Sequence, residues 1–312
     1  MAYTVDELKQ MTVGVLYGGL SAEREVSLKS GDAVARALEG RGYQVARIDV
    51  GKDVDQKLRA AGVQVAFVTV HGRYGEDGCL QGLLESLFIP YTGSGVLASA
   101  LAMDKVFAKQ AFASRGIAIA EYRAFDDARA GEIHGYDLPF HFPVVVKPSG
   151  EGSSVGVKIA KNGEELRKAA QEAAQYKGVV LVERYIKGRE IQVAVLEDEA
   201  LGCIEVKPAG EFYDYNAKYV ANTTQYLFPA PIPEAQYHRC MEVALSAHRA
   251  LLCAGATRTD LILPEHGDPI VLEVNTLPGM TEKSLLPKIA AGKGWDFSEL
   301  CERILRTAAL KA

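Results

Sequence analysis

Two apolar runs near the end of the chain flank a turn-rich segment in the stretch ATRTDLILPEHGDPIVLEVN, residues 256–275. Strand-forming residues on both sides of glycine and proline predict a β-hairpin. A turn centred on the middle of PEHGDP sets Arg258 opposite Asn275 and Asp260 opposite Glu273. Because side chains along a strand alternate between its two faces, all four side chains then share one face. The prediction depends on this register, since a shift of one residue puts the pairs on different faces.

The facing carboxylates of Asp260 and Glu273 repel each other unless something neutralises them. One explanation is a divalent cation, because Mg²⁺ takes oxygen ligands from a few carboxylates together with substrate phosphates. The candidate metal ligands are then Asp260, Glu273 and Asn275. The alternative is a solvated sheet face on which Asp260 forms an ion pair with Arg258.

A second stretch, VVVKPSGEGSSVGVKIA at residues 144–160, breaks a β-branched run after Lys147 and then resumes it. It fits neither GxxxxGK[ST], because no lysine follows the glycines, nor GxGxxG, because the glycine spacing is too wide and a strand follows. The pattern predicts two strands joined by a flap over nucleotide phosphates. Lys147 then supplies a point charge, and Ser149, Ser153 and Ser154 supply donors. The alternative is a polar surface hairpin.

The first third of the chain alternates short apolar runs with helical patterns, which predicts a parallel sheet covered on both faces. Ligands of such sheets bind at the carboxyl ends of the strands. Glu23 follows the first expected strand and His71 ends the third, so we expect both at one edge. Each also has a plain structural explanation. An acid such as Glu23 is favoured in the first turn of a helix, and a lone histidine at the end of a strand is more often structural than catalytic. Residues 93–116 read as one helix rich in small residues.

Composition narrows the functional classes. The 312 residues are 48% hydrophobic and carry a net charge of −5, which fits two or three globular domains and disfavours a nucleic-acid partner. The five cysteines form no CxxC pair and fit reduced cytosolic thiols. With no signal-peptide pattern and no apolar stretch of about 20 residues, we expect a cytoplasmic protein without a membrane span.

Together these stretches resemble the D-alanine–D-alanine ligases of the ATP-grasp superfamily. The resemblance lies in GGLSAEREVSL, HGRYGEDG, YTGSGVLASALAMDK, VVVKPSGEGSSVGV, FYDYNAKY and LEVNTLPGMTEKSLLP, and it covers nearly the whole chain from about residue 12. It implies an α/β (α+β) fold of three domains with ATP held between two antiparallel sheets. We place a Rossmann-like substrate domain at 1–97, a central ATP-grasp subdomain at 98–186 and a C-terminal one at 187–312.

The implied reaction joins two D-alanines for peptidoglycan precursor synthesis. ATP phosphorylates the first D-alanine, and the amine of the second attacks the resulting acyl phosphate. ATP is a co-substrate, and the resemblance implies two Mg²⁺ ions, with Mn²⁺ as a substitute. By analogy the enzyme is a homodimer.

The resemblance also implies roles for individual residues. Lys105, Lys147 and Lys218 match phosphate contacts, and adenine and ribose are held by Glu183, Glu190 and the backbone near Tyr185 and Ile186. The first D-alanine is bound by Glu23 and His71, and the second by Ser284 and Leu285. The oxyanion is stabilised by Arg258 and the N–H of Gly279. The metal ligands are Asp260, Glu273 and Asn275, with Glu273 bridging two ions. A hydrogen-bonded set ties a mobile loop at 207–222 over the site, and it comprises Ser153, Tyr219 and Glu190.

Three other functions remain as alternatives. A nucleotide-dependent kinase is disfavoured by the lack of an HRD-type loop and a DFG sequence. A non-catalytic ATP sensor is disfavoured by the presence of Glu23, Arg258 and the acidic pair. Ligation of D-alanine to D-lactate is disfavoured because AKY in the expected mobile loop contains Lys218 and Tyr219.

Overall fold

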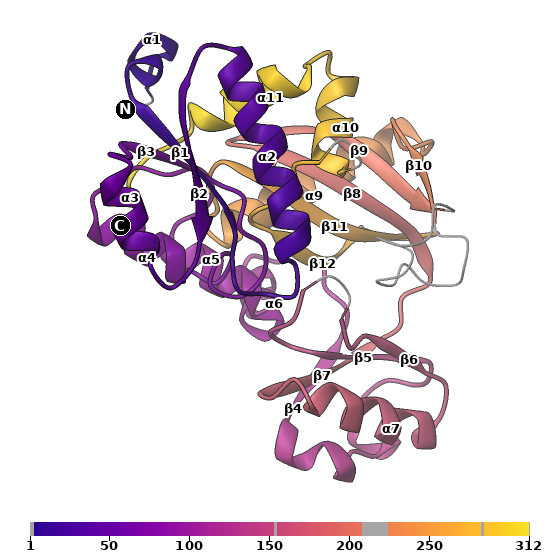
Figure 1. Cartoon of the computed structure of the whole chain (residues 1–312). Coiled ribbons are helices and arrows are strands. Elements are labelled where there is room, and N and C mark those ends of the chain that lie inside the picture. Colours follow the sequence, from indigo (N-terminus) through magenta and orange to yellow (C-terminus); the bar gives the residue numbers. More distant parts are fainter. Residues whose placement is uncertain (1–2, 153–154, 208–223, 282–283, 312) are drawn as a thin grey trace.

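The computed structural model describes residues 3–152, 155–207, 224–281 and 284–311. In this part of the chain the strands form three sheets: one of three strands, one of four and one of five. The four-stranded sheet forms a lobe at the bottom of Figure 1, and the other two sheets lie together above it.

The three-stranded sheet is parallel, with the order β2-β1-β3. Its strands are β1 (Thr12–Gly18), β2 (Gln44–Val50) and β3 (Val65–Val68), and the helices of this region are α1 (Val5–Lys9), α2 (Arg24–Gly40), α3 (Val54–Ala60) and α4 (Cys79–Ser86). All four residues of β3 are buried, as expected of a strand covered on both faces. At the end of β1, Gly18 and Gly19 adopt positive φ angles and redirect the chain toward α2. The predicted parallel sheet is therefore confirmed.

The expected single helix near residue 100 is wrong. The chain forms α5 (Val96–Met103) and α6 (Lys105–Ser114), with Asp104 between them in an extended conformation. The Asp104 carboxylate accepts hydrogen bonds from the N–H groups of Val106 and Phe107. Asp104 therefore caps a new helix, of which Lys105 is the first residue.

The four-stranded sheet is antiparallel, with the order β4-β7-β5-β6. Its elements are β4 (Tyr122–Asp126), the 3₁₀ turns η1 (Asp127–Glu132) and η2 (Gly135–Asp137), β5 (Val144–Pro148), β6 (Lys158–Ala160), α7 (Gly163–Ala174) and β7 (Val179–Arg184). Val144 pairs with Ala160, so the strand–loop–strand arrangement predicted for 144–160 is present. The side chain of Asn162 caps α7, whose apolar face is buried in the core of this lobe.

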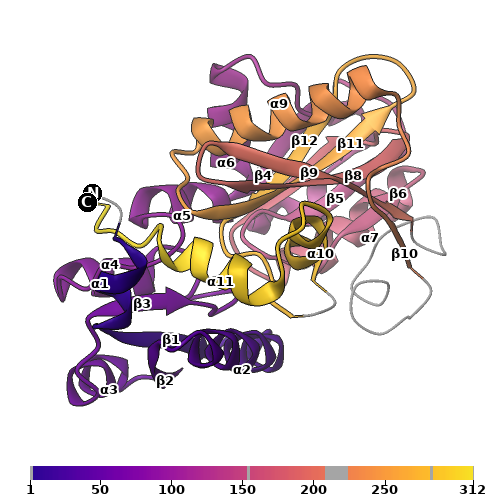
Figure 2. The same ribbon diagram turned by 90° about the horizontal axis from the view of Figure 1, so that it is seen from above.

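The five-stranded sheet is antiparallel, with the order β10-β9-β8-β11-β12. It consists of β8 (Gly188–Leu196), β9 (Glu199–Lys207), β10 (Gln225–Leu227), β11 (Ala256–Pro264) and β12 (Ile270–Asn275). Helix α9 (Glu234–Ala250) covers one face, and α10 (Leu285–Gly292) packs against β8 and β9 on the other (Figure 2). Helix α11 (Phe297–Leu305) packs against α2 and so joins the end of the chain to its beginning.

The register of the β11–β12 hairpin is as predicted at its charged end. Arg258 pairs with Asn275 and Asp260 with Glu273. Closer to the turn, Leu261 pairs with Val271, so a β-bulge adds one residue to β12. The bulge shifts only the apolar end of the hairpin and leaves the four polar residues in their expected pairs.

Candidate active site

A cavity of about 620 Å³ opens between the N-terminal region, the β11–β12 hairpin and the start of α10. It brings together many of the residues predicted from the sequence, and those in its lining are Glu23, His71, Arg258, Glu273, Asn275, Gly279, Ser284 and Leu285.

In the part of the chain that the structure describes, no helix is long and apolar enough to cross a membrane.

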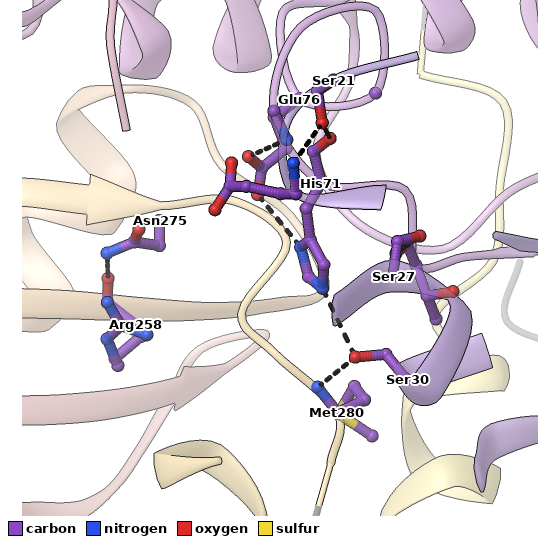
Figure 3. A network of polar contacts seen from close by, with 12 residues as sticks. Ser21, Ser27, Ser30, His71, Glu76, Arg258, Asn275 and Met280 are labelled. Carbon is purple, nitrogen blue, oxygen red and sulfur yellow. Dashed lines mark hydrogen bonds and ion pairs between the residues drawn. The ribbon is translucent and has the colours of Figure 1, made fainter. Parts of the chain in front are cut away.

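Glu23 and His71 form the N-terminal wall of this cavity. The hydroxyl of Ser21 links them, because it accepts the N–H of Glu23 at 3.1 Å and donates to the carbonyl of His71 at 2.7 Å (Figure 3). Gly72 has a φ of +72°, and a Cβ at this position would lie 2.9 Å from the Glu23 carboxylate. A glycine is therefore needed here for both its conformation and its size.

His71 is almost fully buried, with 6% of its surface exposed. Its Nδ1 lies 3.6 Å from Oε1 of Glu76, and its Nε2 lies 3.4 Å from Oγ of Ser30. Burial alone lowers the pKa of the imidazole, but the Glu76 and Glu23 carboxylates outweigh burial and raise the pKa above its ordinary value. This wall can therefore hold a cation, either the imidazolium itself or a ligand ammonium group.

The opposite wall is the polar end of the hairpin. Arg258 donates two hydrogen bonds to Asp260, from Nε at 2.7 Å and from an Nη at 2.9 Å. The side-chain amide of Asn275 donates to the Arg258 carbonyl at 3.4 Å (Figure 3). The ion pair that the sequence left as an alternative is therefore present, although the Asp260 side chain is only 5% exposed rather than solvated.

The oxygen atoms of this hairpin face suit a hard cation. Asp260 and Glu273 are paired across the strands, and the bond made by Asn275 uses its amide nitrogen and not its oxygen. Among the described residues, no three His, Cys, Asp or Glu side chains are grouped so that they could hold a metal ion. A cation here thus needs the Asn275 amide and oxygens from a bound nucleotide, which is the mixed ligand set that Mg²⁺ usually takes.

A buried cluster of lysines lies between α6 and the four-stranded sheet. Lys109 and Lys147 approach the same oxygen, Oε1 of Glu183, at 2.9 and 3.0 Å. Burial raises the pKa of Glu183, but the two ammonium groups lower it by more than burial raises it. The net pKa is below the ordinary value, so the carboxylate stays ionised. Lys109 Nζ and Glu183 Oε1 have no aligned hydrogen bond in the described structure, so the attraction between them is ionic.

Lys105 connects this cluster to the hairpin. Its Nζ donates to the Glu151 carbonyl in the 144–160 loop and lies 3.6 Å from Oε2 of Glu273. Burial, which is the largest influence, lowers the pKa of Lys105. At the base of the same loop, the Ser149 hydroxyl donates to Asp104 at 2.7 Å. The predicted phosphate contacts Lys105 and Lys147 therefore lie in one buried, electropositive region.

The remaining predicted residues lie around these two groups. The N–H of Tyr185, just after β7, donates to the Pro143 carbonyl at 3.3 Å, and Ile186 follows it. Glu190 on β8 accepts from the side-chain amide of Gln192 at 3.2 Å. The predictions for Ser153, Ser154, Lys218 and Tyr219, and for most of the 207–222 loop, concern positions outside the described residues.

The third wall of the cavity is the chain between β12 and α10. Gly279 leaves no room for a side chain, because a Cβ there would lie 2.8 Å from Oγ of Ser284. Ser284 is the residue before α10 and Leu285 is the first residue of that helix. A helix N-terminus attracts anions through its unpaired N–H groups. This wall can therefore accept a carboxylate.

Sequence reasoning missed Lys109, Glu76 and Ser30. Lys109 is four residues after Lys105 on α6, and residues at this spacing lie on the same helix face. Ser30 follows Glu23 by seven residues along α2, which also returns to the same face. The spacing was thus a usable signal for both, whereas their partners come from distant parts of the chain.

The two antiparallel sheets beside a parallel-sheet region, with a buried lysine cluster and an acidic hairpin, define the class as an ATP-grasp enzyme. Comparisons with known proteins narrow this class. The family model for the D-ala D-ala ligase C-terminus matches residues 111–306, and the model for the D-ala D-ala ligase N-terminus matches residues 51–94. The chain belongs to the D-alanine–D-alanine ligase family.

Known proteins are similar to this chain over nearly its whole length. A D-alanine–D-alanine ligase of Anaeromyxobacter sp. (strain Fw109-5) is 61% identical over 96% of this chain and 97% of the relative. One from Geobacter sulfurreducens is 54% identical over 99% and 97%. The D-alanine–D-alanine ligase of Bacillus anthracis complexed with ATP superimposes with a TM-score of 0.83, at 36% identity over 95% and 96%. The VanG D-Ala:D-Ser ligase of Enterococcus faecalis gives 0.82, at 28% identity over 94% and 98%.

Proposed function

We propose that this chain joins two D-alanine molecules at the expense of ATP, releasing D-alanyl-D-alanine, ADP and phosphate for peptidoglycan precursor synthesis. The proposal rests mainly on one cavity, whose lining combines Glu23 and His71, Arg258 and Glu273, and the start of α10. An acidic wall, a cationic donor and a helix N-terminus in one cavity suit two amino acids that must meet at a reacting carbonyl.

In the first step, the carboxylate of the first D-alanine attacks the γ-phosphate of ATP and forms an acyl phosphate, with ADP as the leaving group. Phosphoryl transfer depends mainly on positioning and on neutralising charge. Glu23 holds the ammonium group of this D-alanine, and His71 orients the substrate beside it. The buried position of His71 supports a rigid orientation.

In the second step, the free amine of the second D-alanine attacks the acyl carbonyl, and phosphate leaves after the tetrahedral intermediate. Arg258 and the N–H of Gly279 stabilise the developing oxyanion, a contribution of about 10²–10³ in rate for such a donor. Ser284 and Leu285, at the N-terminus of α10, bind the carboxylate of the second substrate. The partial positive charge at a helix N-terminus supports this role.

ATP is assigned to the region of the buried lysines. Lys105 and Lys147 contact the phosphates, and Glu183, Glu190 and the backbone near Tyr185 and Ile186 hold adenine and ribose. The 144–160 loop covers the phosphates. Asp260, Glu273 and Asn275 would hold two Mg²⁺ ions, with Mn²⁺ as a substitute, and the bound ions would neutralise the charge of the triphosphate.

Three further points belong to the proposal. The domain boundaries 1–97, 98–186 and 187–312 and the homodimer follow from the resemblance. A cytoplasmic location is supported by the use of ATP and by the five cysteines, all of which are free thiols. The loop at 207–222, with Lys218 and Tyr219, is proposed to close over the site together with Ser153, and all of these residues except Lys207 lie outside the described structure.

The test is an incubation with ATP, Mg²⁺ and D-alanine, in which ADP, phosphate and dipeptide are quantified together. We expect one ADP and one phosphate for each D-alanyl-D-alanine, and no dipeptide with L-alanine. A kinase would phosphorylate a stable acceptor and release no phosphate, and an ATP sensor would yield no product. Glu23→Gln should strongly reduce turnover, whereas Glu25→Gln, at an exposed position of the same helix, should not.

A further inference from the structure

Ser30 joins two walls of the cavity through one buried hydroxyl group. It lies on α2, two turns after Glu23, and has no exposed surface. The N–H of Met280, in the segment between β12 and α10, donates to its Oγ at 3.3 Å. The Nε2 of His71, in the segment after β3, lies 3.4 Å from the same Oγ (Figure 3).

The hydrogen-bonding capacities of the three groups fix the direction of the contact with Met280, whereas the direction of the contact with His71 depends on the protonation state of the imidazole. A backbone N–H can only donate, so the Ser30 oxygen is the acceptor for Met280. The Ser30 hydroxyl hydrogen is then available to Nε2 of a neutral His71, which places the ring proton on Nδ1, facing Glu76. When the imidazole is charged, Nε2–H donates to the second lone pair of Oγ. In both states Ser30 contacts both partners.

A second buried serine of α2 shows what a purely structural contact looks like here. Ser27 lies one turn before Ser30 and is equally buried. Its hydroxyl donates to the Thr69 carbonyl at 2.8 Å and accepts the N–H of Gly18 at 2.8 Å. These bonds connect the ends of β1 and β3 and reach neither an ionisable group nor the segment before α10.

We propose that Ser30 is a positioning residue that holds the Gly279–Met280 backbone and the His71 side chain as one rigid unit. The inference rests on the proposed function, in which the N–H of Gly279 is an oxyanion donor and His71 orients the first substrate. Met280 directly follows Gly279, so a bond to its N–H fixes the adjoining peptide. A donor contributes to catalysis only when it is aimed at the place where charge develops.

This role predicts a particular kinetic pattern. Among the described residues, the hydroxyl of Ser30 contacts His71 and Met280, neither of which is assigned to the nucleotide. Its loss should therefore leave the KM for ATP within about twofold of wild type. Ser30→Ala should lower kcat by roughly tenfold to a hundredfold, which is less than the loss expected when an oxyanion donor itself is removed. Ser30→Cys keeps a weak donor and a weak acceptor and should give an intermediate kcat.

The experiment compares Ser30→Ala, Ser30→Cys and the control Ser27→Ala with the wild-type enzyme. For each, kcat, both KM values and the melting temperature are measured, with dipeptide as the product. Ser27→Ala should lower the melting temperature at least as much as Ser30→Ala, because its hydroxyl makes two shorter bonds, yet lower kcat less.

Three results would overturn the inference while wild-type enzyme still makes dipeptide. They are a near-normal kcat in Ser30→Ala, equal kcat losses in the two alanine variants, and a rise in the KM for ATP that accompanies the loss of kcat in Ser30→Ala. Absence of dipeptide with the wild-type enzyme would instead remove the proposed function, and the inference with it.

Discussion

Replacing Lys109 by methionine should weaken ATP binding, although Lys109 is not assigned to contact ATP. Its side chain is 1% exposed, and its ammonium group lies 2.9 Å from Oε1 of Glu183. Lys147, which is proposed to bind phosphate, lies 3.0 Å from the same oxygen. Two cations therefore share one carboxylate.

The size of the effect follows from these distances. Unit charges 2.9 Å apart attract by about 6 kcal/mol at an effective dielectric constant of about 20, before the cost of burial is subtracted. Breaking a buried pair costs about 3–5 kcal/mol when the remaining charge is left alone. Here Glu183 keeps Lys147, so we expect the free energy of unfolding without nucleotide to fall by only about 1–2 kcal/mol.

The remaining energetic cost of replacing Lys109 should appear when the nucleotide binds. When Lys147 turns to a phosphate, Glu183 in the Lys109→Met variant loses its second cation as well. A penalty of about 2 kcal/mol corresponds to a KM for ATP that is higher by roughly thirtyfold. The variant should also discriminate less between ATP and ITP, because a Glu183 without cations takes up a proton and can then donate to the 6-oxo group of ITP.

The assay is steady-state phosphate release with ATP or ITP as the varied substrate. Lys168→Met, which removes an exposed lysine from α7, is the matched control and should behave as wild type. Lys109→Arg keeps the positive charge and should retain more of the preference for ATP. If Lys109→Met folds and shows unchanged KM values for both nucleotides, the sharing of Glu183 has no role in nucleotide binding.

Three further predictions follow from the site and the core. Arg258→Ala should lower kcat by about 10²–10³, measured as D-alanine-dependent phosphate release, and a near-normal kcat would reassign this residue. Glu273→Gln should raise the Mg²⁺ concentration needed for half-maximal activity, and an unchanged titration would exclude it from the metal site. Burial lowers the pKa of His248 to about 4, so its neutral form stabilises the fold above pH 6.5 and that stability is lost as pH falls toward 4. Between pH 7 and pH 5, the free energy of unfolding measured with a chemical denaturant should thus fall by about 2 kcal/mol more for wild type than for His248→Gln. Equal decreases would refute the lowered pKa of His248.

Local patterns were sufficient to predict the hairpin because its register depends on neighbouring residues. The turn sequence and the alternation of side chains placed Asp260 opposite Glu273, and the structure has this pair. The bulge on the apolar side was not predictable. Every residue near it is a plausible strand residue, so nothing in the sequence marks the extra position on β12. Missing the bulge did not affect the predicted polar pairs, because the bulge falls between Asp260 and the turn.

The break at Asp104 was missed for a different reason. The apolar pattern runs through it without interruption, and an aspartate inside a helix is only mildly unfavourable. In the folded chain its carboxylate caps α6 and also accepts the Ser149 hydroxyl from 45 residues away. A contact of this kind depends on the tertiary fold, and no window of local sequence contains it.

The charged groups of the site are paired with one another. Arg258 is bonded to Asp260, Lys105 lies near Glu273, and Lys147 and Lys109 share Glu183. A buried charge without a partner is costly, so these pairs allow the polypeptide to bury the charged groups when it folds. In the proposed reaction, binding of ATP with its cations is then an exchange of partners: phosphates replace carboxylates beside the lysines, and cations replace the basic side chains beside the acids. Such an exchange keeps the local charge nearly balanced, which explains how the sequence can place so many ionisable groups in a largely buried region.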